Sequence, residues 1–153
     1  MTMQRSMAIA GNIANCPMKI CNVLFIEDDV DDIFLFQRAF AQSRIPCQVH
    51  VVQTVAEGIA YLSGRDQFAD RQKFPLPELI ITDLGFRGDD GLQFLNWLHY
   101  ESDCRSIPLV CMTGSSDPEK LAQARTFGAR CIPKTAVYED VVELIRTLLP
   151  QAQ

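Results

Sequence analysis

Residues 78–98 read ELIITDLGFRGDDGLQFLNWL, and this stretch decides the fold class. The apolar residues Leu79, Ile80 and Ile81 lead into Asp83, after which come glycines, two further acids and a helical pattern. Asp83 therefore lies at the end of what looks like a buried strand, where an unpaired carboxylate is costly. Its presence at this position needs a functional explanation.

Short apolar runs recur along the chain at spacings of about 25–30 residues. They lie at 23–26 (VLFI), 49–52 (VHVV), 79–81 (LII), 109–112 (LVCM) and 130–132 (RCI). Periodicity alone cannot assign such short runs to strands, so the segments between them decide the matter.

Helical patterns and helix-end signals fill the intervening segments. Thr54 and Glu57 form a capping-box pattern, and Gly64 follows as a C-cap. Asp117 and Pro118 have the character of an N-cap and the first residue of a further helix. Other helical patterns lie at 33–40, 92–98 and 137–149. Strands that alternate with helices predict right-handed βαβ units and a doubly wound, five-stranded parallel sheet covered on both faces.

The bulk composition is that of one globular domain. The chain has 153 residues, of which 48% are apolar and 22% charged. A net charge of −5 argues against non-specific nucleic-acid binding, and no segment is long enough to span a membrane. We expect a cytoplasmic protein with a flexible tail at 1–18, one domain at 19–150, a surface excursion at 64–77 and no output domain.

The six cysteines show no CxxC pair and no metal-type spacing with either histidine. Most of them fall inside apolar runs. We therefore expect small, buried, hydrophobic side chains in a reducing compartment.

Charged and hydroxyl residues follow the predicted strands. Glu27, Asp28 and Asp29 follow the first strand, Asp83 the third, Thr113 the fourth and Lys134 the fifth. In an open α/β sheet the ligand lies outside the carboxyl ends of the strands, so these side chains should converge at one edge. The alternative is that the acids only favour a helix N-terminus and that the lysine is a solvated surface charge.

This set of side chains suits phosphoryl transfer to a carboxylate. Clustered carboxylates repel one another unless a hard cation binds them, and Mg²⁺ takes few protein oxygens while keeping waters. The metal, a lysine and a hydroxyl can together hold the equatorial oxygens of the transferring group. Asp83 would then be the nucleophile and would form an acyl phosphate.

Four segments, VLFIEDDVDD, LIITDLGFRGDDG, LVCMTGSS and IPK, resemble in order those of the receiver domain of two-component response regulators. The resemblance covers roughly residues 19–149 and implies a flavodoxin-like (βα)5 fold. The ensemble of these features, including the long 64–77 loop, resembles the single-domain regulators that serve phytochrome-type kinases. The resemblance thus implies a sensor histidine kinase as partner and no enzymatic activity beyond self-catalysed phosphoryl acceptance and autodephosphorylation.

The resemblance also implies roles for individual residues. Asp83 would be the phospho-acceptor, Thr113 would sense a phosphoryl oxygen, and Lys134 would pair with it. The Mg²⁺ ligands would be Asp28 directly, Glu27 through water, Asp83, and the backbone carbonyl of Gly85.

Three positions depart from the family pattern. Arg87 replaces the proline that usually stands four residues past the acceptor, and Thr135 replaces the usual cis-proline after the lysine. We expect a trans bond there, because a cis bond before a non-proline residue costs about 3 kcal/mol. Cys131 replaces an aromatic residue that in the family swings inward on phosphorylation, so signalling would rest on Thr113 and the loop through Ser116.

Two other functions remain open. An unphosphorylated pseudo-receiver would be a binding module only, although the intact acceptor, acids, threonine and lysine argue against it. A Mg²⁺-dependent aspartyl-phosphate hydrolase would need a second acid two residues past the nucleophile, where this chain has Gly85.

The last helical pattern predicts a partner surface. Val141 and Ile145 belong to a core-facing stripe, while Val142 and Leu149 lie beyond it and widen the apolar arc to roughly 160°. The expectation is a homodimer through the last two helices and the fifth strand, with Phe127 and Tyr138 adding to the patch; scattered surface apolar residues are the alternative.

Overall fold

The computed structural model of the chain describes residues 20–86, 91–114, 117–134 and 138–149. Its strands are β1 (Cys21–Ile26), β2 (Cys47–Val52), β3 (Leu79–Asp83), β4 (Leu109–Thr113) and β5 (Arg130–Pro133). They form one parallel sheet in the order β2-β1-β3-β4-β5. The predicted parallel sheet is confirmed, and each strand extends its apolar run by one or two residues. The tail predicted at 1–18 lies outside the described residues.

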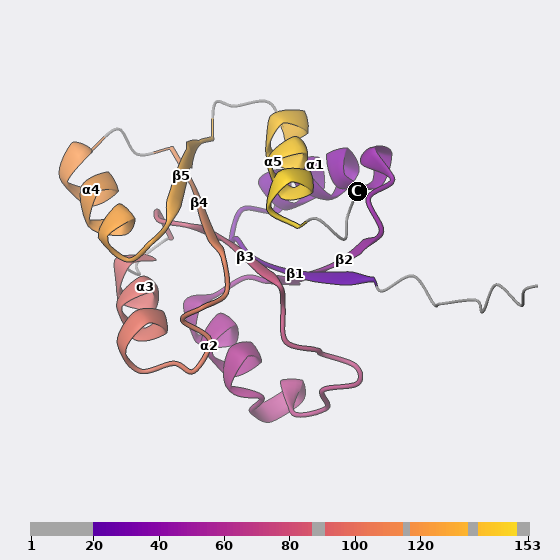
Figure 1. Ribbon diagram of the computed structural model, residues 1–153, viewed down its shortest axis with the longest axis horizontal. Coiled ribbons are helices and arrows are strands. Elements are labelled where there is room, and N and C mark those ends of the chain that lie inside the picture. Colours follow the sequence, from indigo (N-terminus) through magenta and orange to yellow (C-terminus); the bar gives the residue numbers. More distant parts are fainter. Residues whose placement is uncertain (1–19, 87–90, 115–116, 135–137, 150–153) are drawn as a thin grey trace, which may run out of the picture.

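The helices lie in two layers on either side of this sheet. They are α1 (Val30–Ser43), α2 (Val55–Ser63), α3 (Gly91–Tyr100), α4 (Pro118–Thr126) and α5 (Tyr138–Leu148). Helices α1 and α5 cover one face of the sheet, and α2, α3 and α4 cover the other, which makes the fold flavodoxin-like (Figure 1). Among the described residues, no helix combines the length and apolar character needed to cross a membrane.

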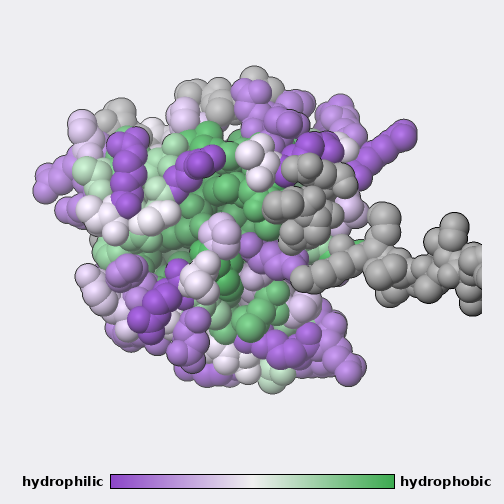
Figure 2. Space-filling view, viewed as in Figure 1, coloured by the Kyte–Doolittle hydropathy of each residue, from purple (hydrophilic) through white to green (hydrophobic). Residues whose placement is uncertain are grey.

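Alternate residues of each central strand supply two separate hydrophobic cores. In β1, Leu24 and Ile26 pack toward α2 and α3, whereas Val23 and Phe25 pack toward α1 and α5. A strand buried on both faces has no polar side to show, which is why the apolar runs are continuous rather than alternating. Figure 2 shows hydrophobic residues gathered between the two helical layers and hydrophilic residues over the outer helix surfaces.

The helix-end signals are confirmed where they were predicted. The Thr54 hydroxyl accepts from the Glu57 N–H at 3.1 Å, and Gly64 takes a positive φ of 63° at the end of α2. The Asp117 carboxylate accepts from the first N–H groups of α4, whose first residue is Pro118. These side chains satisfy backbone groups that have no partner within the helix.

The 64–77 segment, expected to be a surface excursion, packs against the end of α2. It includes a short 3₁₀ helix, η1 (Asp66–Phe68), and Phe68 is buried. The rings of Phe68 and Phe74 pack against Tyr61 of α2, with ring centroids 5.2 and 6.0 Å from that ring. Arg71 donates to the carbonyl oxygens of Tyr61 and Leu62, and so caps the end of α2.

The surface predicted on α5 is wrong in its key residues. Val142 and Leu149 are 4% and 3% exposed, and both belong to the core with Val141 and Ile145. The wide apolar arc is fully used because α5 packs against α1 as well as against the sheet. Phe127 is only half-buried, but its ring faces His99 and Tyr100 of α3 rather than α5.

The prediction of unpaired cysteines is wrong for one pair. Cys21 and Cys47 are joined in a disulfide, while Cys104, Cys111 and Cys131 are free. The separation of 26 positions between the two bonded cysteines gives no sequence signal. They meet because they are the first residues of two neighbouring parallel strands and are register partners.

Candidate functional site

The carboxyl ends of four strands bring the predicted side chains to one edge of the sheet. Glu27 directly follows β1, Asp83 and Thr113 are the last residues of β3 and β4, and Lys134 directly follows β5. The chain leaves β1 toward β2 on one side, and β3 lies on its other side. The edge beside β1 and β3 is therefore the topological switch point of the sheet, where ligands of such folds bind.

Asp83 is held in place by groups on both of its carboxylate oxygens. The residue is 4% exposed and directly follows the fully buried Thr82. The Gly85 N–H donates to Oδ1 at 3.0 Å, and the Lys134 Nζ lies 3.1 Å from Oδ2. The carboxylate that was unexplained at the end of a buried strand thus has an ammonium partner and a backbone donor.

Gly91 allows α3 to start directly beside the acceptor strand. A Cβ on Gly91 would lie 2.7 Å from the Leu84 Cα and 2.9 Å from the Asp83 carbonyl oxygen. Both are backbone atoms, which cannot move aside as the end of a flexible side chain can. Gly91 is therefore a steric requirement for the position of Asp83.

Glu27, Asp28 and Asp83 form a carboxylate cluster. One oxygen from each lies within 4.8 Å of the others, so that a single ion could contact all three. Burial raises the pKa of Glu27, hydrogen bonds from Lys134 and the Asp29 N–H hold this increase back, and the charge of Asp83 adds to it. The donor set consists of hard oxygen atoms, and therefore fits a divalent metal ion such as Mg²⁺ or Mn²⁺.

Lys134 is the cation of the site. Its Nζ lies 2.8 Å from Glu27 Oε2, 2.8 Å from Asp32 Oδ2 and 3.1 Å from Asp83 Oδ2. Burial would lower the pKa of this ammonium, but its hydrogen bonds to Asp32 and Glu27 and the charge of Asp83 outweigh burial and raise the pKa. Lys134 therefore stays charged through the physiological range.

Asp32 is the site residue that sequence reasoning missed. It is assigned no role from the sequence, yet its Oδ2 lies 2.8 Å from the Lys134 Nζ and forms an ion pair with it. The available signal was its spacing, because Asp29 is the N-cap of α1 and accepts from the Asp31 and Asp32 N–H groups. An acid in the first turn after that cap stays beside the strand end.

The remaining predicted positions are placed in part. Thr113 is buried at the end of β4, and its carbonyl oxygen accepts from the Lys134 N–H at 2.9 Å, which fixes the lysine backbone beside the threonine. Gly85 lies two residues past the end of the acceptor strand and is exposed. Arg87 and Thr135 lie outside the described residues, and the trans bond expected before Thr135 stays a prediction.

The comparisons with known proteins agree with this geometry. The sequence model of the response regulator receiver domain family matches residues 23–146 of this chain. Response regulator Rcp1 of Synechocystis sp. is 24% identical over 125 residues, which cover 81% of this chain and 83% of Rcp1.

Solved structures of similar proteins align over most of the chain. The phosphorylated cyanobacterial phytochrome response regulator RcpA is 25% identical with a TM-score of 0.72, and the match covers 85% of this chain and 91% of RcpA. The regulator RPA3017, in red light signaling of R. palustris, is 27% identical with a TM-score of 0.74, covering 84% and 91% of the two chains. This chain therefore belongs to the response regulator receiver domain family.

Proposed function

We propose that this protein is a single-domain response regulator that accepts a phosphoryl group on Asp83 from a phosphohistidine of a sensor histidine kinase. The observation that carries the proposal is the convergence of an ammonium and a metal-type carboxylate cluster on one aspartate. Two similar proteins are named as a phytochrome and a bacteriophytochrome response regulator, which supports a phytochrome-type kinase as the donor. Such a kinase uses intracellular ATP, so we place the protein in the cytoplasm.

The transfer needs little covalent chemistry from the protein. An oxygen of the Asp83 carboxylate attacks the phosphorus, the phosphorus–nitrogen bond to the donor histidine breaks, and an acyl phosphate forms on Asp83. The Lys134 Nζ lies 3.1 Å from the Asp83 Oδ2 and would bind an oxygen of the transferred phosphoryl group, whose negative charge it would stabilise. The Thr113 hydroxyl, at the end of the next strand, would donate to another of these oxygens.

The metal site would be formed by Glu27, Asp28, Asp83 and the Gly85 carbonyl. When bound, Mg²⁺ would neutralise charge on the phosphoryl group and on the clustered acids. Without it, Lys134 is the positive partner of Glu27 and Asp83 among the described residues.

Mg²⁺ should therefore raise the melting temperature at pH 7, because it binds the native cluster and not the unfolded chain. Asp28→Ala should abolish this rise. Asp31→Ala is the matched control: Asp31 belongs to the same acidic run but not to the cluster, so this variant should keep the rise. Differential scanning fluorimetry measures all three proteins; an equal rise in wild type and Asp28→Ala would place the metal elsewhere.

The kinase would approach over α1, whose first turn borders the site. Val30 and Phe34 are 64% and 61% exposed and lie one helical turn apart, and Leu35 beside them is 45% exposed. We call these three residues the α1 patch. Asp32 lies between them in sequence and is paired with Lys134, so a phosphohistidine-bearing segment that covers the α1 patch is beside the acceptor.

Phe34→Asp should lower the rate of phosphotransfer from the kinase by about tenfold or more, because it places a charge in an apolar contact. Labelling by acetyl phosphate should not change, because that donor needs no docking surface. Tyr100→Asp is the matched control, since Tyr100 is 67% exposed but lies at the end of α3. Equal loss of both reactions in Phe34→Asp would mean that the helix, and not docking, was damaged.

The proposal itself is tested by incubating the chain with acetyl phosphate, with and without Mg²⁺, and measuring its intact mass. One phosphoryl adduct that requires Mg²⁺ is expected, with peptide mapping to Asp83. Absence of any adduct, with the fold intact, would favour the alternative of an unphosphorylated binding module.

A homodimer through α4, β5 and α5 stays a prediction. Val142 and Leu149 cannot contribute to its surface, because both are buried in the core.

A further inference from the structure

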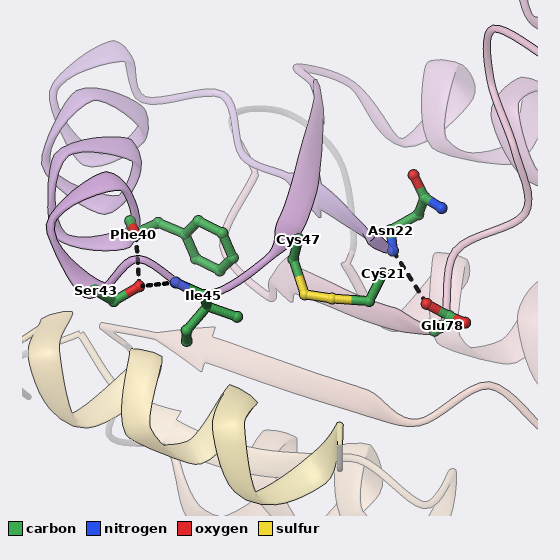
Figure 3. Close-up of a disulfide and its surroundings, with 7 residues drawn as sticks. All are labelled: Cys21, Asn22, Phe40, Ser43, Ile45, Cys47 and Glu78. Carbon is green, nitrogen blue, oxygen red and sulfur yellow. Dashed lines mark hydrogen bonds between the residues drawn. A yellow bond between two sulfur atoms is a disulfide. The ribbon is translucent and has the colours of Figure 1, made fainter. Parts of the chain in front are cut away.

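Cys21 and Cys47 form a disulfide at the amino ends of the strands, whereas the acceptor site lies at their carboxyl ends. They begin β1 and β2, whereas Asp83 ends β3. Their Cα atoms are 4.4 Å apart, within the range that a disulfide spans. The bond therefore links the edge strand β2 to its neighbour β1 (Figure 3).

The two sulfurs differ in how they can be reached. Cys21 is fully buried, whereas Cys47 is half-buried on the edge strand β2. A groove of about 280 Å³ opens between the end of α1 and β2, and Cys47 forms part of its lining together with Gln37 and Arg44. A small molecule in this groove can approach Cys47, whereas Cys21 lies beneath it.

The charge of the groove favours one class of small molecule. Arg44 is exposed at its rim, in the left-handed conformation (φ 56°) that ends α1. The guanidinium attracts carboxylates and stabilises an attacking thiolate, although salt weakens both effects. Phe40 and Ile45 supply an apolar wall. A small thiol that carries carboxylates, of the glutathione class, fits these features.

We propose that Cys21–Cys47 is a reversible redox site that small anionic thiols open through Cys47. The thiolate attacks the Cys47 sulfur, so that a mixed disulfide forms there and Cys21 leaves as a thiolate, which takes a proton from solvent. A second thiolate attacks the small-molecule sulfur of the mixed disulfide, releases Cys47 and forms the small-molecule disulfide. The protein gains two electrons and two protons, and the thiols lose them.

This inference rests on the proposed function in one respect, the reducing compartment in which a kinase-fed switch works. Disulfides in that compartment are usually transient or redox-sensing rather than structural. Opening the bond would remove one link between the starts of β1 and β2, where the Cys21 N–H donates to the Pro46 carbonyl oxygen and the Cys47 N–H donates to that of Ile45. The α1–β2 turn, which Ser43 holds through Phe40 and Ile45, lies directly beside it (Figure 3).

The test uses the full chain in a Cys16→Ser, Cys131→Ser background, which removes two cysteines that could exchange with the pair. The native protein is equilibrated in buffers of varied ratios of reduced to oxidised glutathione, quenched with acid, unfolded, alkylated and weighed by mass spectrometry. We expect the number of alkylated cysteines to differ by two between the extremes and to follow the ratio. Reduction should lower the melting temperature by roughly 5–10 °C, but not in a further Cys47→Ser variant.

Two outcomes would overturn the proposal. Either the pair stays reduced in excess oxidised glutathione, or the disulfide survives excess thiol in the folded protein. Acetyl phosphate labelling of both redox forms separates this proposal from the proposed function. Loss of labelling in both forms, with the titration intact, would refute phosphorylation of Asp83 and leave the redox site standing.

Discussion

Asp83→Asn should reduce Mg²⁺-dependent phosphoryl incorporation by about a thousandfold or more, to background. The amide has nearly the shape of the carboxylate and can still accept from the Gly85 N–H, but its oxygen is a poor nucleophile and carries no charge to attract Lys134. Incorporation is measured from acetyl phosphate by intact mass. Persistence of an adduct in this variant would mean that another carboxylate accepts the group.

The fold should survive this substitution. Asp83 raises the pKa of Glu27 through its charge, so removal of that charge relieves repulsion while it also removes one of the ion pairs of Lys134. These effects oppose each other, and we expect a change in unfolding free energy of less than about 1 kcal/mol. Asp31→Asn, on the exposed first turn of α1, is the control and should label like wild type.

Sequence reasoning located the site because its parts follow a topological rule. Glu27, Asp83, Thr113 and Lys134 each follow or end a strand, and parallel strands bring their carboxyl ends to one edge. The helix-end signals at Thr54, Gly64 and Asp117 also act locally, within a few residues, so they could be read directly.

The failures concern contacts that depend on how distant elements pack. The position of Val142 in a helix pattern shows that it lies off the central stripe, but not that it belongs to the core between the sheet and the α1–α5 layer. The register of β1 against β2 pairs Cys21 with Cys47, and no residue near either cysteine reports that register. Asp32 was passed over because its partner, Lys134, is 102 residues away.

Lys134→Met should destabilise the metal-free protein at pH 7 by about 2–3 kcal/mol. The Met side chain keeps most of the apolar stem but leaves Glu27 and Asp83, 1% and 6% exposed at their side chains, without their cation. Removal of one partner from a buried pair is costly because the other charge stays buried, and the partial exposure of Lys134 reduces that cost. Urea unfolding in EDTA measures the loss, and Lys73→Met, at an exposed position, should show little.

Mg²⁺ should restore more stability to Lys134→Met than it adds to wild type. In wild type the ion must share its carboxylates with an ammonium that already lies 2.8 Å from Glu27, whereas in the variant the cluster is unneutralised. Phosphoryl acceptance should stay low even with Mg²⁺, because the lysine is lost as a partner for the phosphoryl oxygens. Rescue of stability without rescue of labelling would separate the two roles of Lys134.

The pH dependence of Lys134→Met follows from Glu27. Its folded-state pKa is raised above the ordinary 4.5, so the stability that it contributes is fully present below pH 4.5 and is lost as the pH rises through the folded-state pKa. The hydrogen bond from Lys134 lowers that pKa in wild type, and without it the pKa rises further and the loss at pH 7 becomes larger. The difference in unfolding free energy between wild type and variant should therefore be widest near pH 7 and should narrow toward pH 4.5. Part of it should remain, because Lys134 also pairs with Asp32 and Asp83. A difference that stays constant across this range would mean that Glu27 is not the group whose charge Lys134 balances.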